Sequence, residues 1–269
     1  MTAAATTVYY CFMSTATAPV GAIAPPIADY AWRGVFIGVG VVSLWAIHLF
    51  YALTVAPTFY WATPFHIALQ SFLNVGLFIT AHDAIHGSLA PGKRRLNDAV
   101  GATAIFLYGG FVWKKMCENH HAHHANPATD RDPDFAEDGD ERPLRWLLAF
   151  MKRYYSWFNF SVMFVYVMIA WWLSGSYPGM FLYFAIPAWI SAGQLFMFGI
   201  YLPHRTPPGG HTHPHRTVTL DYPEWLSFLA CYHFGYHEEH HDYPGAPWWR
   251  LPAVRRAALA SKSSSRDGI

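Results

Sequence analysis

Histidines are unusually frequent in this chain of 269 residues, which has 16 of them. Two of them, His82 and His86, form an H-x-x-x-H motif, whose spacing places both imidazoles one turn apart on one face of a helix. Two further motifs share the spacing H-x-x-H-H, which brings positions i, i+3 and i+4 to one helical face. Their members are His120, His123 and His124, and then His237, His240 and His241.

Neutral imidazoles at this spacing can bind metal ions, and these eight positions are enough for two ions. Imidazole without thiolate suits iron, zinc, copper or nickel by ligand type alone. One such pair is more often a polar helix face, and a histidine run can bind metal adventitiously. Three clusters, two with the same spacing, indicate a built site instead. We also expect His204, just past an apolar span, to lie at the same depth and to be a ninth ligand.

Polar residues beside the clusters can orient a ligand through its second ring nitrogen. We expect this role for His121, His233, Asp83, Asp132, Asp134 and Glu239. For the acidic residues after the second cluster, the alternative is a solvated loop. We do not expect His211, His213 and His215 to be ligands, because they lie in a loop rich in Pro and Gly.

Long apolar spans must position these clusters, in a chain that is 53% hydrophobic and only 13% charged. Stretches long enough to cross a bilayer as helices run over about 35–56, 64–81, 158–173 and 179–202, and the second continues into His82–His86. Residues 99–113 are shorter and carry three glycines, which favours a re-entrant or interfacial segment. The sequence therefore predicts an all-α integral membrane protein with about four transmembrane helices.

The distribution of Lys and Arg predicts the orientation of these spans, because basic loops stay in the cytoplasm. Every basic loop falls on one side, whereas the connections 57–63 and 174–178 carry no basic residue. Both termini and all three histidine clusters are then cytoplasmic. We divide the chain into a loosely ordered N-terminal segment (1–32), a membrane domain (33–255) and a polar C-terminal tail (256–269). The net charge of +1 and the lack of a basic, aromatic-interleaved stripe argue against a nucleic-acid partner.

The three histidine boxes resemble those of the membrane fatty-acid desaturase and hydroxylase superfamily. More narrowly, the chain is similar to the bacterial beta-carotene ketolases. The strings that carry this likeness are H-D-A-I-H-G-S from His82, D-P-D-F from Asp132, L-P-H-R around His204, and P-W-W-R-L-P from Pro247. Departures are Glu238, where these proteins usually have another histidine, and Ile85 in place of a more usual Met.

The resemblance implies a di-iron centre held by nine histidines in a bacterial inner membrane. Such a centre uses O2 to oxidise the allylic ring carbon 4 of a beta-ionone end group. Two hydroxylations of that carbon give a geminal diol, which loses water to leave the ketone. Beta-carotene would yield echinenone and canthaxanthin, and hydroxylated carotenoids would yield astaxanthin. The carotenoid would enter from the bilayer, and electrons would come from a ferredoxin-type donor, since the chain has no iron–sulfur cysteine pattern and no dinucleotide-binding fingerprint.

Three other functions remain open on the sequence alone. The same scaffold could serve a carotenoid hydroxylase or a fatty-acyl desaturase. Outside the enzymes, a divalent-metal membrane transporter also needs clustered histidines. Transport, however, calls for ionisable groups inside the membrane, and residues 154 to 203 contain no charged residue.

Overall fold

Four long helices dominate the computed structural model, which describes residues 31–56 and 60–266 and contains no strand within those ranges. They are α1 (Ala31–Thr54), α2 (Thr63–Ile85), α6 (Trp157–Ser174) and a continuous run from Tyr177 to His204. Each is long and apolar enough to cross a membrane, which confirms the four predicted spans. The N-terminal segment 1–32 falls almost wholly outside the described residues.

Local sequence signals set the ends of these helices. The short turn η3 (Tyr60–Ala62) leads into α2, which carries Pro64 in its first turn, where a missing N–H costs nothing. At the start of α6, Ser156 and Asn159 form a capping box in which each side chain bonds the other's backbone N–H. The same helix ends at Gly175, whose φ of 61° favours glycine.

The fourth span is built from short α-helical pieces joined by wider, π-helical turns. The α-helical pieces are α7 (Tyr177–Met180), α8 (Ile186–Leu195) and α9 (Leu202–His204), and the π-helical segments are η5 (Phe181–Ala185) and η6 (Phe196–Tyr201). Such turns are frequent at functional sites. His204 is the last residue of this span and therefore lies at the end of the helix bundle.

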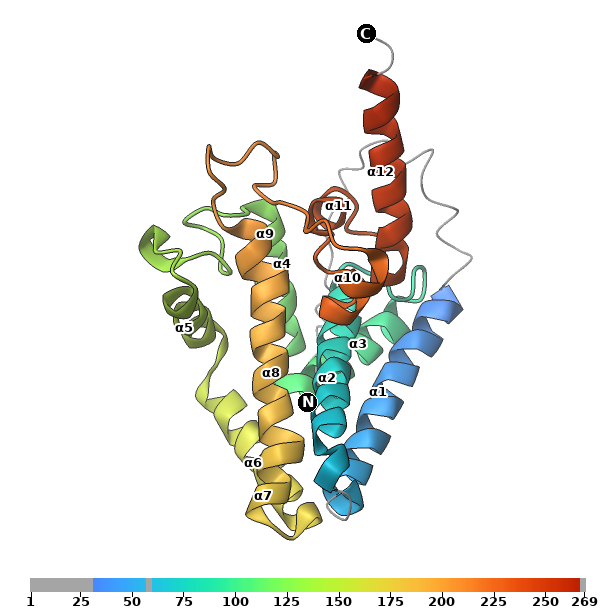
Figure 1. Ribbon diagram of the computed structural model, residues 1–269, viewed down its shortest axis with the longest axis vertical. Helices are drawn as coiled ribbons and strands as arrows, with labels where there is room; N and C mark the ends of the chain where they lie inside the picture. The colour runs from blue at the N-terminus through green and yellow to red at the C-terminus, as the bar shows by residue number, and fades with distance from the viewer. Residues whose placement is uncertain (1–30, 57–59, 267–269) are drawn as a thin grey trace, which may run out of the picture.

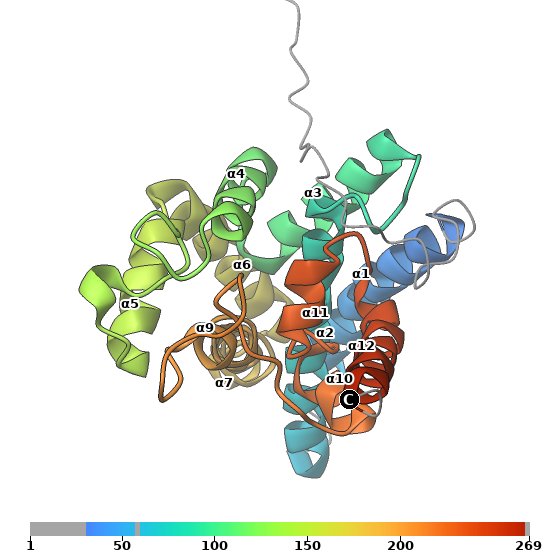
Figure 2. The ribbon, with the colours of Figure 1, turned by 90° about the horizontal axis from the view of Figure 1, so that it is seen from above.

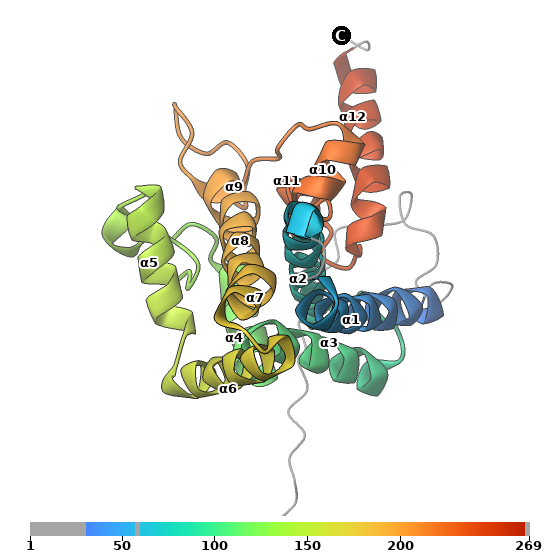
Figure 3. The same cartoon turned by 60° about the horizontal axis from the view of Figure 1, so that its bottom comes forward.

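The spans form two antiparallel pairs, α1 with α2 and α6 with the α7–α9 run (Figures 1 and 3). Helix α2 is the central element and packs against α1, α3 (Arg94–Gly109) and α8. The outer faces of α1 and α6 expose large apolar side chains, such as Phe36 (72% exposed) and Trp172 (77%). Such surfaces suit lipid and not water.

Residues 99–113 cover the second half of α3, a break at Gly110 and the start of α4 (Trp113–Ala125). Gly110 adopts a φ of 68°, and the Asn159 amide donates a hydrogen bond to its carbonyl oxygen at 3.0 Å. The chain therefore turns sharply here, against the start of α6. Whether this segment is re-entrant or interfacial stays a prediction.

Shorter helices gather at one end of the bundle, where α11 lies over the end of α2 in the view from above (Figure 2). They include α4 and five further elements, which are η4 (Glu137–Gly139), α5 (Pro143–Tyr154), α10 (Glu224–Cys231), α11 (His237–Asp242) and η7 (Trp248–Arg250). The last helix, α12 (Leu251–Arg266), takes up most of the polar C-terminal tail. All three histidine motifs lie at this end.

Candidate metal centre

The first group of imidazoles joins three separate helices, α2, α4 and α11. Its five members offer ring nitrogens within 4.8 Å of one another, and they are His82, His86, His120, His124 and His240. The Nε2 atom of His240 lies 3.1 Å from that of His82 and 3.0 Å from that of His124. Bonds of about 2.0–2.1 Å to a common ion would place neighbouring ligand atoms roughly 2.8–3.4 Å apart. The observed spacings fit one metal ion.

The second group is buried and has four members, His123, His204, His237 and His241. The Nε2 atom of His237 lies 2.8 Å from that of His204 and 3.2 Å from that of His241. The two groups adjoin each other, because the rings of His124 and His241 stack with centroids 4.2 Å apart. The structure thus brings together all nine histidines expected to be ligands, in two groups of five and four.

Each H-x-x-H-H motif divides its histidines between the two groups. In α4, His120 and His124 join the first group and His123 joins the second. In α11 the division is reversed, with His237 and His241 in the second group and His240 in the first. The two short helices therefore tie both groups into one unit.

Hydrogen bonds fix the orientation of several rings in the second group. The Nδ1–H of His204 donates to the carbonyl oxygen of Arg216 at 3.3 Å, and that of His237 to the carbonyl oxygen of Phe234 at 3.2 Å. A carbonyl can only accept, so the proton must be on Nδ1 and the Nε2 lone pair points into the group. Imidazoles held in this way are ready to bind a cation.

Burial keeps most of these imidazoles neutral, which is the form that binds metal. Burial, followed by the charge of the neighbouring His123, lowers the pKa of His237 to about 3. Burial, followed by the surrounding imidazoles, also holds the pKa values of His240 and His241 well below the ordinary 6.5. Nitrogen lone pairs facing one another at 3 Å without protons favour an ion between them, so the donor set fits metal.

His123 is the exception, because a carboxylate holds its second nitrogen. Burial acts to lower its pKa, but Asp132 outweighs burial and the pKa is raised. The Asp132 oxygens lie 2.9 and 3.0 Å from His123 Nδ1. They also accept the backbone N–H groups of Ala128 and Asp134, which anchors the loop. Asp132 therefore has the contact expected of a residue that orients a ligand.

Asp134 and Asp83 lie farther from their histidines. An oxygen of Asp134 is 3.8 Å from His123 Nδ1, and one of Asp83 is 3.6 Å from His82 Nδ1. Asp83 also accepts the backbone N–H of Trp248 at 3.0 Å. That bond attaches the P-W-W-R-L-P string to the helix that carries the first histidine box.

Of the remaining three residues expected to orient ligands, Glu239 and His233 contact side chains outside the two groups, and His121 lies near one member of the first group. Glu239 accepts hydrogen bonds from Thr219 and from Arg255 of α12, so it ties α11 to the last helix. His233 stacks on Tyr236 with ring centroids 5.6 Å apart. His121 has its ring centroid 6.5 Å from that of His86. Their roles toward the ligands stay predictions.

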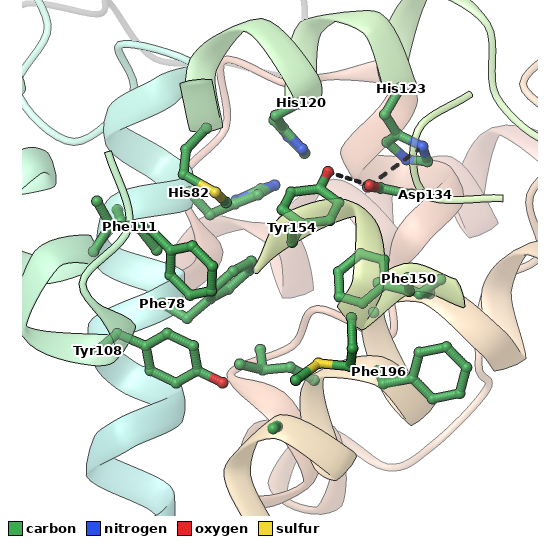
Figure 4. A pocket seen from close by; sticks show the side chains of 18 of the residues that line it. Phe78, His82, Tyr108, Phe111, His120, His123, Asp134, Phe150, Tyr154 and Phe196 are labelled. Carbon is green, nitrogen blue, oxygen red and sulfur yellow. Dashed lines mark hydrogen bonds and ion pairs between the residues drawn. The ribbon is translucent and has the colours of Figure 1, made fainter. Parts of the chain in front are cut away.

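A partly open, largely apolar pocket adjoins both groups. Its polar end is formed by His82, His120, His123, Asp134 and Tyr154, and Figure 4 shows their polar atoms gathered there. The rest of the lining is largely aromatic and includes Phe78, Tyr108, Phe111, Phe150 and Phe196. A bulky apolar ligand could thus place one end beside the imidazoles.

Tyr154 is a site residue that we did not predict from the sequence. It ends α5, is buried, and its hydroxyl donates to Asp134 inside the pocket (Figure 4). Burial, followed by the charge of Asp134, raises the pKa of this phenol, so it stays a hydrogen-bond donor. A tyrosine in an apolar, aromatic stretch has no spacing that distinguishes it from packing residues.

Comparison with known proteins relates the chain to one family. The fatty acid desaturase family model matches residues 59–160 and 141–264. A beta-carotene ketolase of Paracoccus sp. (strain N81106 / MBIC 01143) is 38% identical over 88% of this chain and 98% of its own length. Another, of Paracoccus sp. (strain PC1), is 42% identical over 71% of this chain and 78% of its own. A zeaxanthin 4-ketolase of Chlamydomonas reinhardtii is 36% identical over 87% of this chain and 55% of its own.

Proposed function

Because this chain belongs to the fatty acid desaturase family, we propose that it is an oxygenase that converts carbon 4 of a beta-ionone ring to a ketone, with beta-carotene as substrate. The observation that carries this proposal is the junction of nine histidines, in two groups, with an aromatic pocket. The relatives named as beta-carotene ketolases support the choice of reaction.

The cofactor we propose is a pair of iron ions, one in each histidine group. Iron suits an all-imidazole donor set, and when bound it would supply the activation of O2. The nine imidazoles would hold the ions through Nε2. Asp132 and the carbonyls of Arg216 and Phe234 would fix the orientation of three of these rings, so that each Nε2 points toward its ion.

The pocket would bind the end group of the carotenoid. A beta-ionone ring and its polyene are apolar, and aromatic walls provide a large contact area for them. Between the polar end and these walls, the ring would lie with its oxidised edge toward His82, His120 and His123. We propose that the pocket opens laterally to the bilayer, in which the substrate dissolves.

Electrons would reach the site from a separate protein on the cytoplasmic face. Basic residues gather in the loops on the same side as the histidine groups and would attract an acidic, ferredoxin-type donor. The Lys114–Lys115 pair begins the histidine-bearing α4. If purified chain in lipid turned over repeatedly with no donor protein or artificial reductant, this part of the proposal would be wrong.

Product analysis in a host that makes beta-carotene tests the reaction. We expect echinenone and canthaxanthin with the wild-type chain, and neither with His240→Ala, which removes a nitrogen shared by two close contacts of the first group. Thr212→Ala, in an exposed loop, is the control and should retain both products.

Other products would identify other functions. Hydroxylated carotenoids alone would identify a hydroxylase, and altered fatty acids would identify a desaturase. A second host that makes zeaxanthin would show whether hydroxylated rings are accepted.

A further inference from the structure

Two side chains outside the nine histidines reach the polar end of the pocket, Tyr154 from α5 and Asp134 from the loop before that helix. Both are buried, with 6% and 8% of their surface exposed. The Tyr154 hydroxyl donates its hydrogen bond to one Asp134 oxygen, and Figure 4 shows this pair beside His120 and His123. The pair therefore borders the space in which a substrate would meet the imidazoles.

The hydrogen-bonding capacity of this pair is one-sided. A tyrosine hydroxyl has one proton, and Tyr154 gives that proton to Asp134. The Asn119 side chain also bonds the Tyr154 hydroxyl, which occupies one lone pair of its oxygen and leaves the other. The second Asp134 oxygen lies 3.8 Å from His123 Nδ1, which is too far for a hydrogen bond. The pair thus has no donor to spare, but it can accept further hydrogen bonds.

Neighbouring groups hold these acceptors in place. Trp146 of α5 is fully buried and donates its indole N–H to the backbone oxygen of Asp134 at 2.7 Å. The backbone N–H of Asp134 bonds an Asp132 oxygen at 2.8 Å. The ring of Phe150 packs against that of Tyr154, with centroids 4.5 Å apart. Little ordering is therefore needed when a ligand binds to the pair.

The species of the proposed reaction differ in what carbon 4 offers to these acceptors. Beta-carotene has only C–H groups there, whereas the alcohol formed by the first hydroxylation carries an O–H donor. The geminal diol carries two such donors. The ketone has an acceptor oxygen and no proton. A site with spare acceptors and no spare donor favours the hydroxylated species over both the substrate and the final product.

We propose that Tyr154 and Asp134 retain the 4-hydroxy intermediate by accepting a hydrogen bond from its new hydroxyl. The second hydroxylation then takes place before the intermediate leaves the pocket. The ketone offers no proton to the pair, so the same site releases it. This inference rests on the proposed ketolase reaction and names the residues that separate ketone formation from simple hydroxylation.

The ratio of early products tests the role of the pair. Full-length protein in lipid nanodiscs receives beta-carotene, O2 and a ferredoxin with its reductase, and released 4-hydroxy and 4-keto rings are counted. Tyr154→Phe removes one acceptor and the bond that orients the other. We expect it to raise the ratio of hydroxy to keto rings about tenfold, with bound metal unchanged. A purely structural role would lower both products together.

Tyr201→Phe is the matched control, because it also removes a phenol hydroxyl. Tyr201 packs against Trp146 with ring centroids 5.7 Å apart and does not line the pocket. Its variant should give the wild-type ratio. Equal ratios in Tyr154→Phe and the wild type would overturn the proposal.

A trapping experiment tests retention in the wild type itself. Labelled beta-carotene is supplied together with an excess of unlabelled 4-hydroxy carotenoid. If the intermediate is retained, the label passes into the ketone, whereas in Tyr154→Phe it collects in the alcohol. Label collecting in the alcohol with the wild type would overturn the retention and leave the ketolase function intact. Absence of any ketone from the wild type would count instead against the proposed function.

Discussion

The buried pair of His123 and Asp132 shows how one residue prepares another for metal. The carboxylate accepts the Nδ1 proton at 2.9 and 3.0 Å, which leaves Nε2 free to face His204 and His237. It also stabilises any positive charge that the ring shares with a bound ion. The next acidic residue, Asp134, bonds Tyr154 and lies farther from the ring. Orientation of His123 therefore rests mainly on Asp132.

Removing the Asp132 carboxylate should weaken metal binding. We expect Asp132→Ala to reduce metal affinity about 10- to 100-fold, the range typical of lost hydrogen bonds to a ligating histidine. Asp132→Asn keeps an acceptor oxygen but loses the charge, so its metal affinity should lie between those of the wild type and Asp132→Ala. Competition with a chelator, followed by analysis of the bound metal, measures the metal affinity of each variant. Asp130→Ala, in the same loop but exposed, is the control. Equal affinities for Asp132→Ala and Asp130→Ala would show that Asp132 does not support the site.

His233 gives a residue-level prediction about pH. Burial lowers its pKa from 6.5 to about 4. As pH falls below 6.5, the unfolded chain takes up a proton at this ring and the folded chain does not. This part of the stability is therefore intact above 6.5 and is lost as pH falls toward 4. Asparagine tolerates the φ of 62° at this position and does not titrate.

We expect the free energy of unfolding of the wild type to fall more steeply than that of His233→Asn between about pH 6.5 and pH 4.5. Unfolding by denaturant in detergent, at a series of pH values and with metal-free protein, measures both curves. Parallel curves would mean that the ring of His233 is accessible to protons in the folded state.

At the level of elements, helical periodicity explains both the success and the limit of the sequence prediction. Positions i and i+4 differ by about 40° around a helix and i+3 lies about 60° to the other side, so all three share a face. That is why spacing alone predicts that the histidines of α4 and α11 gather, as they do in the two groups. The same angles let His123 and His240 face a different group from their neighbours, and that division depends on where the helices dock.

Docking also explains what the sequence did not reveal. Tyr154 reaches the pocket only because α5 packs beneath the loop of Asp134. Glu239 alternates with ligands in sequence, yet its side chain bonds Arg255 of α12. Such contacts join residues distant in the chain, and no local spacing predicts them. The four spans, by contrast, follow from length and hydrophobicity alone.

The approach of α1 to the loop after α2 permits a direct test of this packing. A Cβ at Gly34 would lie 1.7 Å from the carbonyl oxygen of Leu89, a backbone atom that cannot rotate away. Gly34→Ala should therefore push α1 from the loop that follows the first histidine box, at a cost of about 1–3 kcal/mol. Gly40→Ala in the same helix meets no atom within 4 Å and should be neutral or slightly stabilising. Thermal unfolding in detergent compares the two, and equal midpoints would argue against this close approach.

At the level of the whole molecule, the candidate metal centre and the apolar spans occupy different parts of the chain's fold. The four spans expose apolar side chains and contribute to the pocket wall, while the histidine groups lie at one end, where α4 and α11 supply six of their nine members. Basic loops gather at this same end. If that end is cytoplasmic, as the positive-inside rule predicts, then iron, electrons and the donor protein all arrive from one compartment and the substrate from the bilayer.

Cysteine labelling in spheroplasts tests this orientation. Cys117 and Cys231 are buried, so a chain with Cys11→Ser should react little with a membrane-impermeant maleimide. In that background, Tyr177→Cys places a thiol at a position that is 71% exposed, at the start of the fourth span and just after its connection to the third. It should react in intact spheroplasts. Thr212→Cys, exposed in the loop beside the histidine groups, should react only after the membrane is permeabilised. The opposite pattern would place the metal centre outside the cell, where no cytoplasmic ferredoxin could reduce it.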